Sequence, residues 1–240
     1  MSEIAIVTGG TRGIGAAISK DLIRLGFQVA AVYGGDTEAA ARFEEETGAR
    51  AFCWDVSDFE ACQKGVQQIE EEMGPVSVLV NNAGITRDGT LQKMTDERWQ
   101  VVIQTNLSSC FNMCHAVIGG MRERGYGRIV NIGSINGQAG QYGQVNYAAA
   151  KSGIHGFTKA LAQEAAAFGV TVNAIAPGYI ETSMVAQVPE RILEKIVARI
   201  PVGRLGQPEE IARGVAFLVD REAGFITGST LSINGGQHMY

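Results

Sequence analysis

Short apolar runs with β-strand composition alternate with amphipathic stretches from one end of the chain to the other. The runs that predict strands are Ile4–Thr8, Gln28–Tyr33, Ala49–Trp54, Val76–Asn82, Gly127–Ser134, Val170–Pro177 and Ser229–Gly235. The stretches that predict helices between them include Ile14–Gly26, Thr37–Gly48, Phe59–Met73, Asp96–Arg124 and Tyr147–Phe168. Such alternation favours parallel strands joined by right-handed crossovers, with helices on both faces of the sheet. The sequence therefore predicts an α/β, doubly wound Rossmann-type fold with a seven-stranded parallel sheet.

The composition fits one compact unit without a surface for polyanions. The 240 residues are 45% hydrophobic, and no Pro/Gly/Ser-rich linker or block of charge interrupts them, so we expect residues 1–240 to form a single domain. The net charge of −5 disfavours nucleic-acid binding, which needs a concentrated excess of Lys and Arg. No apolar run approaches the ~18 residues of a membrane helix, and no secretory leader is recognisable, so we expect a cytoplasmic protein.

The four cysteines predict neither a disulfide framework nor a metal centre. Their spacing is too irregular for a disulfide-rich fold. Cys110 and Cys114 share a face of a predicted helix and His115 follows them, but the sequence has no second Cys or His pair with zinc-like spacing. We expect buried or half-buried thiols and no metal.

The first predicted strand is followed by the glycine-rich segment TGGTRGIG, which opens the first predicted helix. Parallel α/β sheets bind ligands at the carboxyl ends of their strands, and glycines without Cβ let a pyrophosphate approach the free N–H groups of a helix N-terminus. A tight strand-to-helix turn is the alternative, but the position within a βαβ unit favours a dinucleotide. The residues expected to contact it are Gly9, Thr11, Arg12, Gly13, Ile14 and Gly15.

The second predicted strand indicates which nicotinamide cofactor is used. An acidic residue at its end would accept a hydrogen bond from a free ribose 2′-hydroxyl, whereas an arginine would bind a 2′-phosphate. The strand ends at Tyr33 with no acid before Asp36, and Arg12 lies within the glycine turn. This favours NADP(H), although a different loop path would bring Asp36 to the ribose.

Two further segments at predicted strand ends are candidates for the cofactor site. Asp55 follows the third predicted strand and could accept from the adenine amino group or act as the N-cap of the next helix. The fourth strand ends in NNAG, in which Asn82, Ala83 and Gly84 could contact the cofactor or tie neighbouring strands together.

Tyr147 and Lys151 form the candidate catalytic pair. They stand four residues apart on a predicted helix and so share one face. Reduction of a ketone leaves an alkoxide that must be protonated, and a neighbouring ammonium group can lower the pKa of a phenol so that it serves as the acid. Ser134, at the end of the fifth strand, could hydrogen-bond the substrate carbonyl and hold it against the phenol.

These motifs resemble the short-chain dehydrogenase/reductase family. The resemblance rests on TGGTRGIG, NNAG, Asn106 in TNLSS, the Ser134, Tyr147 and Lys151 set, PGYIET and ITGSTLSINGG, and it covers essentially the whole chain. It implies a catalytic tetrad that includes Asn106, which would hold a proton-relay water near Lys151. It also implies the strand order 3-2-1-4-5-6-7, a homotetramer, and cofactor contacts from Pro177, Gly178 and Ile180.

Within that family, SINGQAGQYGQVNY and NNAGITRDGTLQKM resemble the acetoacetyl-CoA reductases of polyhydroxybutyrate synthesis. The resemblance implies NADPH-dependent reduction of acetoacetyl-CoA, a small-molecule acyl-CoA substrate, to (R)-3-hydroxybutyryl-CoA. Gln141 and Gln144 could donate to the carbonyl groups of the substrate and Tyr142 could supply a flat wall, whereas a polar surface loop is the alternative. Further substrate contacts implied by the resemblance are Asp88 and Tyr179. A pair of helices within about residues 181–203 is expected to cover the substrate.

Two features of the sequence leave points open. Gly133 stands where many members of the family have a second serine, so the hydroxyl network near Ser134 is expected to be thinner. Arg191 could meet a phosphate of CoA or face water.

Three other functions remain open at the level of sequence. A 3-oxoacyl-[acyl-carrier-protein] reductase would act on the same β-keto thioester, and a basic patch formed by Arg122, Arg124 and Arg128 could dock its acidic carrier. A non-catalytic dinucleotide-binding module is disfavoured, because a binding protein needs no acid beside the nicotinamide. Oxidation of a sugar or polyol on the same scaffold would be indicated by a lack of turnover of β-keto thioesters.

Overall fold

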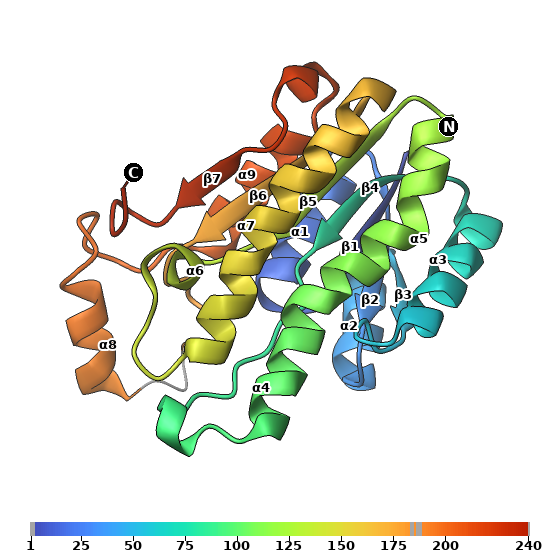
Figure 1. Cartoon of the computed structure of the whole chain (residues 1–240). Helices are drawn as coiled ribbons and strands as arrows, with labels where there is room; N and C mark the ends of the chain where they lie inside the picture. Colours follow the sequence, from blue (N-terminus) through green and yellow to red (C-terminus); the bar gives the residue numbers. More distant parts are fainter. Residues whose placement is uncertain (1–2, 183–184, 186–188, 240) are drawn as a thin grey trace.

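The computed structural model describes residues 3–182, 185 and 189–239, and its strands form one parallel sheet (Figure 1). The strand order is β3-β2-β1-β4-β5-β6-β7, and every neighbouring pair runs parallel, which confirms the predicted order and fold class. The strands are β1 Ile4–Thr8, β2 Gln28–Tyr33, β3 Arg50–Cys53, β4 Val76–Asn81, β5 Gly127–Ile132, β6 Val170–Pro177 and β7 Thr230–Ile233.

Helices cover both faces of this sheet. They are α1 Gly13–Arg24, α2 Thr37–Thr47, α3 Phe59–Met73, α4 Asp96–Ile103, α5 Ser109–Glu123, α6 Ile135–Ala139, α7 Val145–Ala165, α8 Glu190–Val197 and α9 Pro208–Val219. One core cluster packs β1 and β4 against α3, α5 and α7, and the other packs the same strands against α1 and α9. Because apolar helices lie on both sides, β1, β5 and β6 are buried at every position.

The predicted helix Asp96–Arg124 is interrupted in the structure. A π-helical turn, Gln104–Ser108, separates α4 from α5 and contains Asn106. Single π-turns within helices occur frequently at functional sites. No periodicity in the sequence marked this interruption.

Helix α9 was not identified from the sequence, although its start carries a clear signal. Pro208 occupies the first helical turn, and Gln207 and Glu210 form a reciprocal capping box. Proline at this position and a glutamate three residues after the cap are typical of a helix N-terminus.

The predicted helical segment at about 181–203 is described only in part. Residues 183–184 and 186–188 of that segment lie outside the described residues. In the described stretch 189–203 one α-helix is present, α8, which stands apart from the sheet beyond α6 (Figure 1). Among the described helices, none is long and apolar enough to span a membrane.

Candidate active site

The side chains of Ser134, Tyr147 and Lys151 come together at the carboxyl end of β5. Ser134 follows β5 and is the N-cap of α6, where its Oγ accepts a hydrogen bond from Asn136 N at 3.1 Å. Lys151 is only 4% exposed, and its Nζ donates to the carbonyl of Ile132, the last residue of β5, at 2.7 Å. The same Nζ lies 5.7 Å from the ring centroid of Tyr147. The lysine therefore links the catalytic helix α7 to the strand that carries Ser134.

Asn106 lies beside this group and is fully buried. Its Oδ1 accepts from Ile85 N at 2.8 Å, and its Nδ2 donates to Ile85 O at 2.9 Å. A Cβ placed on Gly84 would lie 3.4 Å from Asn106 Oδ1 and 3.6 Å from Lys151 Nζ. The loop after β4 thus approaches both side chains, and the four residues predicted as a tetrad share one site.

Burial shifts the pKa values of the tyrosine and the lysine in opposite directions. It raises the pKa of Tyr147 from its ordinary value of 10.0, although a hydrogen bond with Ser134 opposes this effect. Burial lowers the pKa of Lys151 to about 8, while the nearby Cys110 thiol opposes it. The expectation that Lys151 lowers the phenol pKa is therefore wrong for this structure, because desolvation is the larger effect. Lys151 gives up its proton at a lower pH than Tyr147 does.

The glycine turn after β1 has the geometry that a pyrophosphate requires. Gly9 and Gly13 have φ values of 62° and 53°, which favour glycine. A Cβ on Gly15 would lie 2.0 Å from the carbonyl oxygen of Gly9, so this position admits no side chain. Arg12 is the N-cap of α1 without a side-chain cap, which leaves N–H groups of the first turn of α1 available to an anion. The residues present therefore fit the diphosphate of a dinucleotide.

The NNAG segment joins β4 to the glycine turn. The backbone N–H groups of Asn82 and Ala83 both donate to Thr8 Oγ1, at 2.9 and 3.0 Å. The side-chain amide of Asn82 donates to Thr8 O at 2.9 Å. Of the two roles considered from the sequence, these contacts support the structural one, and direct contact with a cofactor stays a prediction.

The two acidic residues near the predicted adenosine end have defined local partners. Asp36 is the N-cap of α2, and its carboxylate accepts from Ala39 N at 3.0 Å. Asp55 accepts from the N–H and the hydroxyl of Ser57, at 2.8 and 2.7 Å. The N-cap of α3 is Asp58, because the helix begins one residue later, so the capping role considered for Asp55 is wrong. Its predicted contact with adenine is not affected by this correction.

A hydrogen-bonded chain of polar side chains borders the catalytic group. Asn136 Nδ2 donates to Gln144 Oε1, and Gln144 Nε2 donates to Asp88 Oδ2, both at 2.9 Å. Gln138, Gln141 and Gln144 follow Ser134 at steps of three residues, but the first two differ from Gln144, since Gln141 is exposed and Gln138 donates to Ser232 Oγ at 3.0 Å. The structure thus brings Gln144 and Asp88 together, as predicted contacts of one substrate. Asn136 joins them, and it was not identified from the sequence although it lies two residues after Ser134.

Tyr142 is 87% exposed, and its predicted contact with the substrate stays a prediction. Tyr179 does lie at the site, following β6. Burial raises the pKa of its phenol, while a hydrogen bond with Asn136 lowers it. Tyr179 is therefore the aromatic side chain that adjoins the Asn136–Gln144–Asp88 chain.

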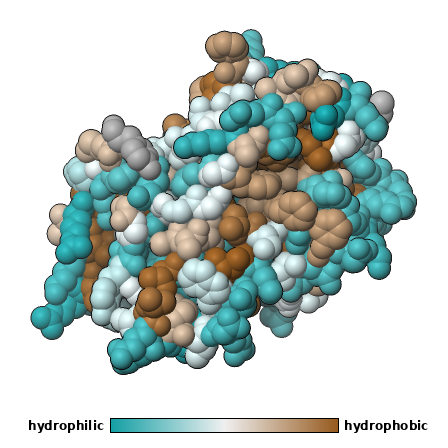
Figure 2. Space-filling model, viewed as in Figure 1, coloured by the Kyte–Doolittle hydropathy of each residue, from teal (hydrophilic) through white to brown (hydrophobic). Residues whose placement is uncertain are grey.

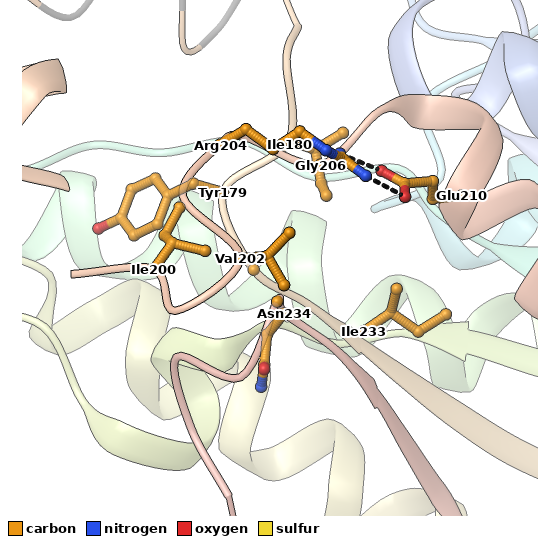
Figure 3. Close-up of a pocket in the computed structure, with 11 residues that line it drawn as sticks. Tyr179, Ile180, Ile200, Val202, Arg204, Gly206, Glu210, Ile233 and Asn234 are labelled. Carbon is orange, nitrogen blue, oxygen red and sulfur yellow. Dashed lines mark hydrogen bonds and ion pairs between the residues drawn. The ribbon is translucent and has the colours of Figure 1, made fainter. Parts of the chain in front are cut away.

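A pocket of about 160 Å³ lies between the loop after β6 and the segment after β7 (Figure 3). The Tyr179 ring lies on one side of the pocket and the ion pair between Arg204 and Glu210, with 2.8 Å hydrogen bonds, lies on another. Its lining residues are Gly178, Tyr179, Ile180, Ile200, Val202, Arg204, Gly206, Glu210, Ile233, Asn234 and Gly235. Pro177, the last residue of β6, directly precedes the lining residue Gly178. The N–H of Gly178 donates to Ile233 O at 2.9 Å.

Comparison with known proteins agrees with this geometry. The short-chain dehydrogenase model described as enoyl-(acyl carrier protein) reductase matches residues 9–238. An acetoacetyl-CoA reductase of Shinella zoogloeoides is 61% identical over 99% of each chain. An acetoacetyl-CoA reductase of Cupriavidus necator is 51% identical over 99% of this chain and 98% of its own. A 3-oxoacyl-[acyl-carrier-protein] reductase of Vibrio harveyi is 45% identical, also over 99% of this chain and 98% of its own. The chain therefore belongs to the short-chain dehydrogenase/reductase family and is an oxidoreductase that uses a nicotinamide dinucleotide.

Proposed function

We propose that this enzyme reduces acetoacetyl-CoA to (R)-3-hydroxybutyryl-CoA with NADPH, which supplies a precursor for polyhydroxybutyrate. The observation that carries the proposal is the 61% identity, over 99% of both chains, to the acetoacetyl-CoA reductase of Shinella zoogloeoides. The relative named for an acyl-carrier-protein substrate is less similar, at 45%. The group formed by the half-buried Tyr147 with the buried Ser134 and Lys151 supplies the acid that reduction of the keto group requires.

Ser134 and Tyr147 act on the keto oxygen of the substrate. NADPH, when bound, supplies a hydride to the carbonyl carbon. Ser134 Oγ accepts from Asn136 N, and its hydroxyl hydrogen, which is directed at Tyr147 in this structure, would turn to the substrate oxygen. Tyr147 donates its phenolic proton to that oxygen as the alkoxide forms, and its hydrogen bond with Ser134 aligns both groups on one atom.

Lys151 and Asn106 return a proton to Tyr147. The ammonium group of Lys151 has three hydrogens and uses one on Ile132 O, which leaves two for a ribose hydroxyl and a relay water. With a pKa of about 8, the lysine exchanges a proton readily near neutral pH. Asn106 holds the relay water next to it, and its two hydrogen bonds to Ile85 fix the position of the side chain.

NADPH is preferred over NADH because Arg12 binds the 2′-phosphate. Arg12 is exposed at the N-terminus of α1, and the carboxylate of Asp36 is occupied by its capping hydrogen bond to Ala39 N. No acid competes with the phosphate at the end of β2. The further proposed contacts of the cofactor are Gly9, Thr11, Gly13, Ile14, Gly15, Asp55, Asn82, Ala83, Gly84, Pro177, Gly178 and Ile180.

Gln144 is the central substrate-binding residue outside the tetrad. One N–H of its amide is held by Asp88, so the other is oriented toward a carbonyl of the thioester. Gln141, Tyr142 and Tyr179 line the path of the pantetheine arm around it. The aromatic side chain of Tyr179, one of the residues that line the pocket, would limit the acyl length.

The basic patch considered for an acyl carrier protein does not form an exposed cluster. Arg128 is only 4% exposed, and its guanidinium donates to carbonyl groups that include Asp220 O and Arg221 O. Arg124 donates to Val76 O, and Arg122 stacks on the ring of Phe168 at 3.9 Å. Arg128 is therefore not available to a docking partner, whereas Arg122 and Arg124 are exposed, and a docking role for these two stays a prediction.

We also propose that the protein acts as a cytoplasmic homotetramer of single-domain subunits. Both core clusters share one sheet, and Phe111, Phe217 and Phe225 are 51%, 55% and 102% exposed on the outer surface. Large exposed aromatic side chains of this kind are often covered in an oligomer. Light scattering after size-exclusion chromatography tests this, because a monomeric mass of 25.5 kDa would contradict it.

The function is tested by following NADPH absorbance with acetoacetyl-CoA and with acetoacetyl-carrier protein at matched concentrations, with identification of the product enantiomer. Preference for the CoA ester and formation of the (R) alcohol would support the proposal. Preference for the carrier protein would assign the enzyme to fatty-acid elongation. Turnover of neither thioester would show that the site serves another substrate.

A further inference from the structure

We propose that α8 carries a binding site for the phosphorylated nucleotide end of the CoA thioester, formed by Arg191, Lys195 and Arg199. This α8 basic stripe rests on the proposed function and assigns residues that recognise CoA rather than the acyl group. Its ligand chemistry is that of an adenosine 3′-phosphate 5′-diphosphate, which carries several negative charges close together.

The stripe follows from the sequence periodicity of α8 and the turn after it. Arg191 and Lys195 are four residues apart and therefore lie above one another on one side of α8, and Arg199 follows at the same spacing in the turn after the helix. Glu190 and Glu194 share a different side by the same spacing. Isoleucine, leucine and valine occupy the third side, so charges of opposite sign are segregated along the helix.

On α8 the charged neighbours at a spacing of four residues carry the same sign, and the one opposite-charge pair at a spacing of three is Arg191 and Glu194. Like charges four residues apart repel each other, whereas a Glu followed by a Lys four residues later would stabilise the helix. In the described part of the chain, Arg191, Lys195 and Arg199 form no ion pair, and all three are exposed. A row of cations without ion pairs would attract an anionic ligand.

The stripe leads to the site described above. The positive charge of Arg199 acts on the hydroxyl of Tyr179, which lies next to Asn136 and Gln144. Ile200, the next residue, is 5% exposed and lines the pocket beside Tyr179. A substrate whose thioester lies at Gln144 could therefore extend past Tyr179 and place its charged end along α8.

The side chains of α8 are exposed to a degree that suits contact with a ligand and not packing in the protein core. Among the described residues, no member of α8 is buried. Hydrophilic and hydrophobic side chains lie in adjacent strips over this helix (Figure 2). An exposed site is consistent with a large polar nucleotide that remains hydrated while the acyl end enters the enzyme.

The experiment compares acetoacetyl-CoA with the acetoacetyl thioester of N-acetylcysteamine, which lacks the nucleotide and all phosphates. For the triple variant Arg191→Gln, Lys195→Gln, Arg199→Gln, we expect kcat/KM for acetoacetyl-CoA to fall about eightfold at low salt, about twofold for each exposed charge pair. We expect kcat/KM for the truncated thioester to stay unchanged. The wild-type value for the CoA ester should fall with added salt, and that dependence should be lost in the variant.

Two further variants separate charge recognition from damage to the helix. The double variant Arg191→Gln, Lys195→Gln keeps Arg199 beside Tyr179 and is expected to lose about fourfold with the CoA ester. The matched control Glu190→Gln, Glu194→Gln removes the acidic side and should bind the CoA ester as well as or better than the wild type.

Several results would overturn the inference. Equal losses with both thioesters would show that α8 acts on the acyl end, and an unchanged CoA ester would show that the stripe is only solvated. A loss confined to the acetoacetyl-carrier protein would assign the stripe to protein docking, and a loss confined to the KM of NADPH would assign it to the cofactor. The proposed function would instead be refuted if the wild type reduced none of the three substrates, which are the truncated thioester, the carrier-protein ester and the CoA ester.

Discussion

Burial of Lys151 makes the folded protein less stable, and the substitution Lys151→Met tests both this cost and the proposed role of the lysine in proton transfer. The side chain is 4% exposed, and burial lowers its pKa from 10.5 to about 8. In the unfolded chain the lysine would titrate at its ordinary value. The protonated lysine is therefore held at a cost that the fold must offset, whereas methionine of similar length has no charge to desolvate.

The pKa values set the size and the pH range of this effect. The difference between 10.5 and about 8 corresponds to ~3 kcal/mol, at about 1.36 kcal/mol per pKa unit. Below pH 8 the full cost is present, because the lysine is charged in both states. Between pH 8 and 10.5 the unfolded chain binds more protons than the folded one, so stability rises with pH. Above 10.5 the cost is gone.

The net change at pH 7 is smaller than this difference. Removal of Nζ takes away the hydrogen bond to Ile132 O, and an unpaired buried carbonyl costs about 1–3 kcal/mol. We therefore expect Lys151→Met to stabilise the protein by ~1 kcal/mol at pH 7, or roughly 2–4 °C in Tm for a chain of this length. The same variant should lose nearly all turnover, because the proton relay is interrupted.

Thermal melts of the wild type and the variant at pH 7 and pH 10 test the reasoning. The stability difference between the two proteins should shift in favour of the wild type by ~2.5 kcal/mol over this range, or roughly 5–10 °C in Tm. Lys159→Met, which removes an exposed lysine two turns further along α7, is the matched control and should show no such change. Parallel pH dependences for wild type and Lys151→Met would refute the lowered pKa of the buried lysine.

The remaining predictions concern single contacts. Tyr147→Phe should reduce kcat at least roughly 100-fold with NADPH affinity nearly unchanged in a fluorescence titration, and retained turnover would reject the assigned acid. Gln144→Ala should raise the KM for acetoacetyl-CoA roughly fivefold, more than Gln141→Ala does, because only Gln144 is held by Asp88. An equal response of the two glutamines would contradict this. Arg12→Ala should raise the KM for NADPH roughly tenfold and leave that for NADH unchanged, and equal losses would show that Arg12 does not bind the 2′-phosphate.

The sheet could be predicted closely because its strands are buried on both faces. In β1, β2 and β6 the apolar runs begin and end where the strands do, since a turn residue follows each run directly. The proximity of Ser134, Tyr147 and Lys151 followed from the same logic, because Ser134 comes two residues after β5 and Tyr147 and Lys151 share a face of α7. Local spacing was sufficient for each of these assignments.

Contacts between distant segments could not be predicted in the same way. The three glutamines after Ser134 have equal spacing in the sequence, yet Gln144 bonds to Asp88 and Gln138 to Ser232, residues far away along the chain. The π-turn at Asn106 is another case, because its hydrogen bonds to Ile85 come from the loop after β4. Partners of this kind are set by the fold and leave no periodic pattern.

Gly133 shows how one such contact settles a question that the sequence left open. A Cβ at this position would lie 3.0 Å from Cε1 of His155 and 3.1 Å from the carbonyl oxygen of Ile175, both closer than ordinary contacts. His155 stands one turn after Lys151 on α7, and its Nδ1 lies 3.2 Å from Thr230 Oγ1, which holds the ring against β5. A serine at 133 would have to displace this ring or the backbone of β6. The missing hydroxyl is therefore a steric consequence of the histidine behind the catalytic lysine, and the hydrogen bonds of Ser134 and Lys151 do not depend on it.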